Sequence, residues 1–129
     1  MADPVSALQQ EKFSNFLKNS LTTNESQIVD MLSQFSNYQQ LLIKYNDNIN
    51  LISHNDLEIL WVRHYLDSLI PIKIFYDIPP HSSKFVEVID IGSGAGFPGM
   101  PICIAVPNAR VTLVESIQKK VNFLLELKN

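Results

Sequence analysis

The sequence predicts an α/β fold in which a helical region at the N-terminus precedes the start of a parallel sheet. Three observations support this prediction. Apolar side chains recur at helical spacing through residues 4–69, whereas residues 85–91 form a β-branched run that is typical of a strand. All four glycines of the 129-residue chain follow that run directly, within residues 92–99. Because average usage would give about nine glycines in a chain of this length, we expect these four to meet a local backbone requirement.

Two helices are expected at the start of the chain. Residues 4–19 carry apolar side chains on one helical face. Asn24 followed by Gln27 has the spacing of a capping box, in which each side chain accepts a hydrogen bond from the other residue's backbone N–H. The apolar stripe of this second helix continues to about Asn46. The Asn- and Asp-rich run at residues 46–50 then indicates a turn.

A third helix is expected after this turn. Asn55 and Glu58 again have the spacing of a capping box. Apolar residues continue at helical spacing to Leu69, and Pro71 follows at the expected helix end. Trp61 lies within this predicted helix, and we expect it to pack in the core rather than to stack on a base.

The second part of the chain has the pattern of a βαβα unit. Residues 85–91 predict a strand that is buried on both faces in its second half. The prolines after the first three glycines suit the first turn of a short helix that continues to Val106. Residues 110–115 predict a second strand, and Ser116 is expected to cap a final helix. A unit of this kind implies two parallel strands.

These elements divide the chain into two regions. A Pro- and Ser-rich run at residues 79–83 indicates a linker. We therefore predict an N-terminal helical region at residues 1–78 and a βαβα unit at residues 84–129. Because two strands leave the sheet incomplete, the sequence predicts only the start of an α/β domain. We expect the chain to be the N-terminal part of a longer protein, either a truncated product or a fragment.

Composition argues against several classes of protein. The net charge of −3 is not typical of a nucleic-acid-binding domain, and the adjacent Lys119 and Lys120 are expected to be solvated. No apolar run is long enough to predict a membrane span, and the first residues lack the pattern of a signal peptide. The single Cys103 cannot form an internal disulfide, which fits the cytoplasm, and we expect it in the core. The histidines and Cys103 lack the spacing of metal ligands, so no metal is expected.

The glycine loop lies where a strand turns directly into a helix. At such a turn we expect the first N–H groups of the helix to lack partners and to point toward a ligand above the strand end. Glycine permits positive φ and lets a ligand approach the backbone closely. Glu115, at the end of the next strand and 23 positions after Gly92, is placed to accept hydrogen bonds from ribose hydroxyls.

Two overlapping patterns share these glycines. Gly94 to Gly99 reads G-x-G-x-x-G, the pattern of dinucleotide-binding sites. Asp90 to Gly96 reads D-x-G-x-G-x-G and resembles the first motif of class I S-adenosylmethionine-dependent methyltransferases. An aspartate at the strand end would repel a pyrophosphate but suits a ligand with a cationic amino group and a sulfonium. Asp90 therefore favours S-adenosylmethionine, and an NAD(P)-binding oxidoreductase module is the alternative.

A longer stretch is more specific than the glycines alone. Asp90 to Pro101, with its Phe-Pro-Gly-x-Pro extension, resembles the glycine loop of the bacterial 16S ribosomal RNA guanine-N7 methyltransferases. These enzymes form the small-subunit methyltransferase G family, also called glucose-inhibited division protein B. Further stretches agree with the family in order and spacing, and they lie within residues 44–53, 63–68 and 111–124. One departure is Ile52, where the family commonly has Thr.

The resemblance implies a Rossmann-like class I methyltransferase domain after the helical region, with S-adenosylmethionine as cofactor. It implies methylation of guanine N7 in 16S ribosomal RNA, with the RNA or the small ribosomal subunit as partner. By position it implies that Arg63, His64 and Asp67 lie close to the pocket, the first two as substrate-binding residues; alone they would indicate only a polar helix surface. It also implies cofactor-binding roles for residues of the loop and of the second strand end, namely Gly92, Gly94, Gly96, Phe97 and Glu115.

The implied chemistry requires few catalytic groups. Guanine N7 carries a free lone pair, so no proton must leave before attack, and positioning can supply most of the rate enhancement. We therefore expect no obligatory general base. Asp67 and Asp90 are the catalytic candidates, because a negative charge would offset the positive charge that develops on the guanine ring.

The length of the chain limits these expectations. The family's later cofactor contacts, which follow its third and fourth strands, have no counterpart in this sequence. We expect the 129-residue chain to bind S-adenosylmethionine weakly and to show little activity. Micromolar binding in calorimetry would contradict that expectation. A non-catalytic helical binding module is the third alternative, and retention of a partner without activity would favour it.

Overall fold

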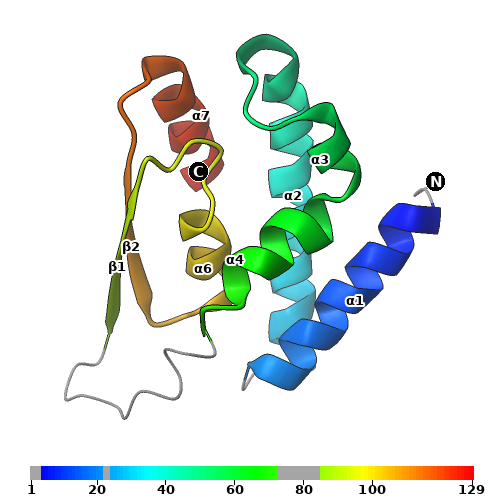
Figure 1. The fold of residues 1–129 in the computed structure, drawn as a ribbon. Helices are drawn as coiled ribbons and strands as arrows, with labels where there is room; N and C mark the ends of the chain where they lie inside the picture. The colour runs from blue at the N-terminus through cyan, green and yellow to red at the C-terminus, as the bar shows by residue number, and fades with distance from the viewer. Residues whose placement is uncertain (1–3, 22–23, 73–84) are drawn as a thin grey trace.

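The computed structural model describes residues 4–21, 24–72 and 85–129. Its N-terminal half is helical, and its C-terminal half contains two strands that alternate with two helices (Figure 1). The elements in chain order are α1 (Pro4–Ser20), α2 (Glu25–Ile49), α3 (His54–Glu58), the π-helical segment η1 (Trp61–Leu66), α4 (Asp67–Leu69), β1 (Val86–Ile91), α6 (Gly99–Ala105), β2 (Ala109–Val114) and α7 (Gln118–Lys128).

Helix α2 begins as the sequence predicts. The Asn24 side chain accepts a hydrogen bond from Gln27 N at 2.9 Å, and the Gln27 side chain accepts one from Asn24 N at 3.0 Å. The helix continues beyond Asn46, the predicted end, and stops at Ile49, where Asn50 adopts a left-handed conformation with φ of 44°. The buried Asn46 side chain accepts two backbone N–H groups of the following turn, at 2.7 and 2.9 Å. Asn46 therefore stabilises the turn from within the helix.

The predicted start of the third helix is wrong. Ser53, not Asn55, caps α3, because the Ser53 hydroxyl accepts Asp56 N at 3.1 Å while Asn55 already lies inside the helix. The predicted partner Glu58 is the last residue of α3. The chain then continues into η1, whose wider turns interrupt the single helix that the sequence predicts, before α4 begins. π-Helical turns are rare and are frequent at functional sites.

Aromatic side chains form the centre of the helical core. The Phe35 ring of α2 lies 4.8 Å from the Phe13 ring of α1 and 4.7 Å from the Tyr65 ring of η1, measured between centroids. Trp61 is 2% exposed and meets Tyr65 edge to face at 5.2 Å, which confirms its predicted place in the core. These contacts bury three helical segments against one another, and such aromatic pairs stabilise a core beyond the area that they bury.

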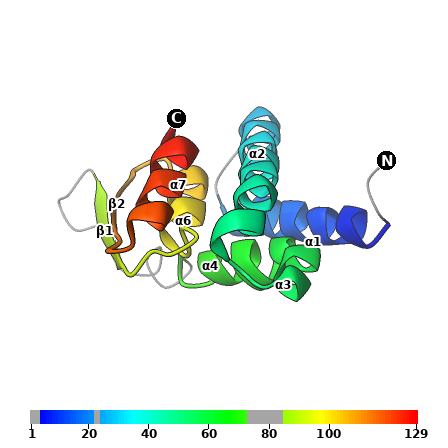
Figure 2. The ribbon, with the colours of Figure 1, turned by 90° about the horizontal axis from the view of Figure 1, so that it is seen from above.

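The βαβα unit is observed with parallel strands. β1 pairs with β2 from Val86 opposite Ala109 to Ile91 opposite Val114. Helices α6 and α7 lie on one face of this two-stranded sheet, and α2 lies beyond them (Figures 1 and 2). The fold is thus the start of a Rossmann-like domain preceded by helices, with a sheet that is not closed.

The prediction that the second half of β1 is buried on both faces is wrong. Burial alternates along the strand, so that Asp90 is 8% exposed whereas its neighbours Ile89 and Ile91 are 67% and 81% exposed. Within the described residues, helices cover only one face of the sheet (Figure 2). The β-branched side chains of the other face therefore remain in contact with solvent.

The expected cap of the last helix is also wrong. Helix α7 begins at Gln118 after Ile117, and no side chain of the capping residue bonds its first turn. Ser116 lies before this position. Its backbone N–H and that of Ile117 instead donate to the Glu115 carboxylate, at 2.8 and 2.9 Å. A strand-end carboxylate thus orders the entry into the helix.

Other sequence-based expectations have mixed outcomes. Cys103 of α6 is exposed, so the expectation that it lies in the core is wrong. The predicted linker at residues 79–83 lies outside the described residues, and so does the proposed division between residues 1–78 and 84–129. No helix among the described residues is long and apolar enough to cross a membrane.

Candidate functional site

The glycine loop joins the carboxyl end of β1 to α6. Its first N–H groups, from Gly92 and Ser93, both donate to Val114 O of β2, at 2.8 and 3.1 Å. Gly92, Gly94 and Gly96 have φ of 77°, 56° and 95°, a region that side-chain-bearing residues rarely adopt. The loop therefore starts at the edge where the two parallel strands end, and its course depends on glycine.

Two of these glycines differ in the space around them. A Cβ built on Gly96 would lie 2.5 Å from the Tyr38 hydroxyl and 3.1 Å from Met100 Cγ. A Cβ built on Gly92 would meet nothing within 4 Å, and Gly92 is exposed. The loop is therefore packed against the protein at Gly96 and open at Gly92, and Gly92 is the side from which a ligand could approach the backbone.

Asp90 holds the start of α6. Its carboxylate is buried and accepts the Gly99 N–H at 3.0 Å, and the next N–H, from Met100, donates to Gly96 O at 2.7 Å. The expectation that the first N–H groups of this helix lack partners is thus wrong. Since a negative charge already occupies this helix terminus, an anionic group placed there would be repelled.

Glu115 closes the other side of the loop. Its carboxylate accepts Gly94 N at 2.8 Å in addition to the N–H groups of Ser116 and Ile117. The hydrogen bonds from Ile117 and Gly94, and more weakly that from Ser116, lower the pKa of Glu115, although partial burial opposes them. The carboxylate that was expected to bind ribose therefore also ties the glycine loop to the end of β2.

Tyr38 of α2 is a loop contact that the sequence pattern did not reveal. Its hydroxyl donates to Ala95 O at 2.5 Å, and the side chain is 1% exposed. Burial, with smaller effects of Tyr65 and Asp90, raises the pKa of Tyr38 well above its ordinary value, so the hydroxyl remains a donor. In the sequence Tyr38 belongs to an apolar stripe, and only its hydroxyl distinguishes it from the other core residues.

Phe97 is a second residue of the loop that contacts the helical region. Its half-buried ring lies nearly parallel to the Tyr38 ring at 5.5 Å and to the His64 ring at 4.8 Å. His64 Nε2 is buried, lies 3.6 Å from an Asp56 carboxylate oxygen, and has no hydrogen-bond partner among the described residues. The π-helical segment η1 thus places the face of an imidazole ring against the loop, while the ring's Nε2 lies beside Asp56.

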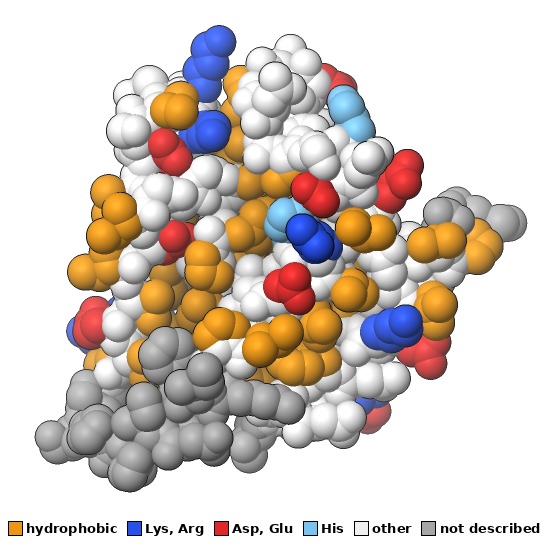
Figure 3. Space-filling model, viewed as in Figure 1, with side chains coloured by type: hydrophobic (Ala, Val, Ile, Leu, Met, Phe, Trp, Pro, Cys, Tyr) orange, Lys and Arg blue, Asp and Glu red, His pale blue; other side chains and the backbone are white. Residues whose placement is uncertain are grey.

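The remaining residues of the sequence-predicted cluster lie on the surface. Arg63 of η1 and Asp67 of α4 are exposed, and neither makes an ion pair or a hydrogen bond from its side chain within the described part of the chain. Of the three predicted residues, only His64 touches the loop. On the face shown in Figure 3, basic, acidic and histidine side chains lie next to one another and no basic patch forms.

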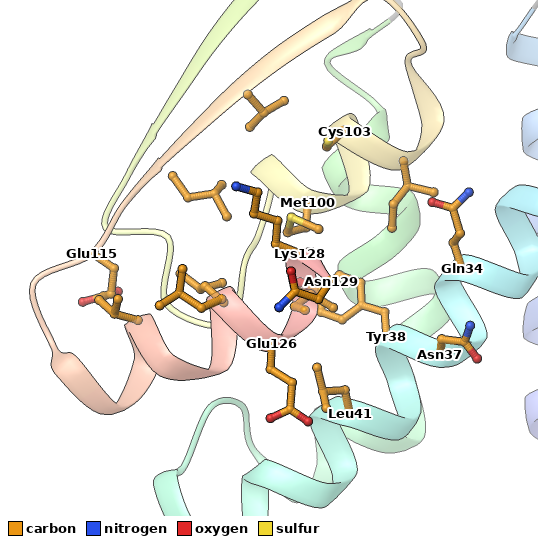
Figure 4. A pocket seen from close by; sticks show the side chains of 17 residues that line it. Gln34, Asn37, Tyr38, Leu41, Met100, Cys103, Glu115, Glu126, Lys128 and Asn129 are labelled. Atoms are coloured by element: carbon orange, nitrogen blue, oxygen red, sulfur yellow. The ribbon is translucent and has the colours of Figure 1, made fainter.

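A cavity of about 820 Å³ lies between α2, α6, β2 and α7 (Figure 4). Its walls are mostly apolar, and Tyr38, Cys103 and Glu126 are among the residues that line it. Of the predicted site residues it touches only Glu115, and residues 92–97 of the loop do not line it. The cavity is therefore separate from the open side of the glycine loop.

No group of three or more His, Cys, Asp or Glu side chains that could hold a metal ion occurs among the described residues. The polar side chains near the loop include two carboxylates, an imidazole, a phenol and the Ser93 hydroxyl, and both carboxylates accept backbone N–H groups.

Comparison with known proteins agrees with this architecture. The family described as "GidB: rRNA small subunit methyltransferase G" matches residues 31–129. A protein of Lysinibacillus sphaericus (strain C3-41) named ribosomal RNA small subunit methyltransferase G is 36% identical over 94% of the chain and 47% of its own length. Proteins of the same name from Geobacillus kaustophilus (strain HTA426) and Bacillus thuringiensis (strain Al Hakam) are 40% and 36% identical, over 74% and 91% of the chain.

The similarity covers only part of each relative. The aligned segments make up 38% of the Geobacillus protein and 46% of the Bacillus protein, so the chain spans less than half of the length of these relatives. It nevertheless includes nearly all of the chain's own residues, with both the helical region and the glycine loop. The chain belongs to the rRNA small subunit methyltransferase G family.

Proposed function

We propose that this chain forms the first part of the cofactor site of an enzyme that methylates guanine N7 in 16S ribosomal RNA. The proposal assigns S-adenosylmethionine as cofactor, the small ribosomal subunit as partner and the cytoplasm as location. It rests on the names of the relatives and on the geometry of the loop. The relatives' names specify only a methyltransferase of small-subunit rRNA. The methylated base, the methylated atom and the cofactor are what we propose in addition.

One observation carries the choice of cofactor. The Asp90 carboxylate bonds Gly99 N–H at the N-terminus of α6, the position at which a dinucleotide-binding fold receives a pyrophosphate. A phosphate group there would meet a buried negative charge. S-adenosylmethionine has no phosphate and carries two cationic centres, so the same charge attracts it. The site thus favours S-adenosylmethionine over NAD(P).

The residues at the loop fit such a ligand. Gly92 leaves its side of the loop open, and Gly94 and Gly96 give the backbone the course that a side chain would prevent. Glu115 would accept a ribose hydroxyl, and the half-buried Phe97 ring would form an apolar wall. S-adenosylmethionine, when bound, supplies a methyl group that its sulfonium has already activated.

The chain's other residues would act on the RNA. The exposed Arg63 guanidinium suits a phosphate of the RNA backbone, and the His64 ring lies beside the loop. Asp67 is exposed, whereas Asp90 is buried and occupied by Gly99 N–H. Asp67 is therefore the better placed of the two carboxylates to face a guanine ring on which positive charge develops. No residue needs to remove a proton, because N7 attacks through its lone pair.

A titration followed by NMR tests the choice of cofactor on the 129-residue chain. Millimolar S-adenosylhomocysteine is expected to shift the amide signals of Gly92 and Gly94, and NAD is expected to leave them unchanged. Glu115→Ala should weaken the response, and Glu87→Ala, at an exposed strand position, serves as the control. Shifts with NAD and none with S-adenosylhomocysteine would overturn the proposal in favour of the dinucleotide module.

A second experiment tests the catalytic part. In a protein that carries this chain and methylates small-subunit particles, Asp67→Asn is expected to lower kcat by about tenfold, less than the roughly hundredfold lost with a buried oxyanion-hole donor, because Asp67 is exposed. Asp47→Asn, at an exposed position of α2, is the matched control. Full turnover of the Asp67 variant would remove this residue from the mechanism.

A further inference from the structure

We propose that Tyr38 is a positioning residue that holds the glycine loop in its ligand-binding shape from helix α2. The proposal deepens the proposed function, and its ligand-binding arm rests on that function. Tyr38 is distant from the loop in sequence, 57 residues before Ala95. Neither the glycine pattern nor any motif of the loop assigns it a role.

Three consecutive loop residues contact Tyr38. The Tyr38 hydroxyl donates to Ala95 O at 2.5 Å. The Tyr38 hydroxyl oxygen would also lie 2.5 Å from a Cβ built on Gly96. The Tyr38 ring lies nearly parallel to the Phe97 ring, at 5.5 Å between centroids. Ala95 is 6% exposed, so its carbonyl has little access to water if the phenol is removed. The loop is therefore fitted around one side chain.

The loop needs such an external contact. Three glycines within five residues give the backbone more conformational freedom than residues with side chains would. Glu115, the residue after β2, fixes the loop at Gly94, and Tyr38 of α2 fixes the next three residues. Because Tyr38 is 1% exposed, it cannot reach a ligand on the open side of the loop. It acts on the ligand only through the backbone that it holds.

The test compares two conservative variants of the 129-residue chain. Tyr38→Phe keeps the ring and removes the hydroxyl. Tyr65→Phe is the matched control, because the fully buried Tyr65 hydroxyl also donates to a backbone carbonyl, that of Phe35 at 3.1 Å, but within the helical region. The first measurement is amide hydrogen exchange at Gly96 and Met100, whose N–H groups close the loop.

Tyr38→Phe is expected to speed exchange at Gly96 by about tenfold relative to Tyr65→Phe, the change that one buried hydrogen bond can produce. Equal exchange at the loop in the two variants would overturn the proposal. Phe97→Leu gives a second reading if Tyr38→Phe does not fold, since it removes the ring contact and keeps the hydroxyl. Faster exchange at Gly96 in that variant supports the proposal, and unchanged exchange contradicts it.

The second measurement is the affinity for S-adenosylhomocysteine. Tyr38→Phe is expected to raise Kd several-fold, with Tyr65→Phe close to the unmodified chain. An unchanged Kd in the Tyr38 variant would contradict a positioning role. Absence of binding in every variant would contradict the proposed function, and the hydrogen-exchange result would still decide the role of Tyr38.

Discussion

The helical region and the βαβα unit bury their apolar side chains to very different degrees. In the helical region, rings from three segments enclose one another, and Phe13, Phe35 and Tyr65 are fully buried. In the sheet, one face packs against α6 and α7 while Ile89 and Ile91 stay exposed on the other. Hydrophobic side chains are visible over the strands in Figure 3. The buried side chains of both regions join in one core, to which the sheet contributes only one of its faces.

This difference shows where the stability of the chain comes from. Burial of apolar area is the main favourable contribution to folding, and the helical region contains most of the fully buried large side chains. The glycine loop lies between the two regions and is held by one residue of each, Tyr38 and Glu115. Substitutions in the core, in the loop and at the sheet should therefore change the free energy of unfolding by different amounts.

The largest effect is expected at the centre of the helical core. Phe35→Ala removes a fully buried ring with two close aromatic neighbours and should lower the free energy of unfolding by about 3–5 kcal/mol. Ile91→Ser, at a side chain that is largely exposed, should change it by less than about 0.5 kcal/mol. Urea denaturation of both variants measures the contrast. Similar losses would show that the exposed sheet face is covered in solution.

The next effect is expected in the loop. Gly96→Ala places a Cβ against the Tyr38 hydroxyl at a positive φ, so it should cost about 2–4 kcal/mol from crowding and backbone strain together. Gly92→Ala has the strain without the crowding, and about 1–2 kcal/mol is expected. Thermal unfolding of the two variants gives the comparison. The idea that Gly96 is packed and Gly92 is open fails if the order is reversed.

A pH-dependent effect is expected at the end of β2. The pKa of Glu115 in the folded chain lies below its ordinary 4.5, so its stabilisation is fully present above about pH 4.5 and is lost as the pH falls through the lower, folded-state pKa. Glu115→Gln cannot lose this charge. Its free energy of unfolding should therefore fall less than that of the unmodified chain between about pH 5.5 and 3.5. An equal loss of unfolding free energy in the variant and in the unmodified chain, measured by denaturation at both pH values, would contradict a stabilising role of the Glu115 hydrogen bonds.

The smallest effect is expected at the exposed contact between α2 and α7. Glu126 accepts hydrogen bonds from Lys44 at 3.0 Å and from Tyr45, and these bonds lower the pKa of Glu126. Lys44→Met should lower Tm slightly, and added salt should reduce the difference, because exposed ion pairs are screened. Lys12→Met, at an exposed position of α1, is the control. A difference that persists in high salt would indicate an apolar rather than an ionic contribution.

Local sequence signals predicted most of the fold. Helical spacing located α1 and α2, and the Asn24–Gln27 box marked the start of α2. The errors arose where two signals competed or where tertiary contacts decided. Ser53 and Asn55 can both cap a helix, and the chain uses the earlier one. The exposed side of β1 could not be inferred, because a β-branched run looks the same whether one or both faces are covered.

The site was predicted less completely than the fold. Asp90 and the glycines belong to one motif, and Glu115 follows the next strand. Because the two strands are parallel neighbours, the proximity of these residues could be predicted from the order of the elements. Their hydrogen bonds did not, since both carboxylates bond the loop's own backbone. Tyr38 was missed because a hydroxyl inside an apolar stripe gives no sign of its partner. The contact of His64 with Phe97 was also missed, because the two residues are 33 positions apart and no local pattern joins them.

The three backbone N–H groups that donate to Glu115 limit the number of hydrogen bonds that its carboxylate can accept from a ligand. A carboxylate has about four lone-pair sites, and Gly94, Ser116 and Ile117 use three of them. A ligand with two neighbouring hydroxyls would find one acceptor vacant and would have to displace a backbone donor for the second. The second hydroxyl would then contribute only the difference in free energy between its own hydrogen bond and the backbone bond that it displaces. If the displaced donor is Gly94 N–H, ligand binding would change the backbone conformation at Gly94.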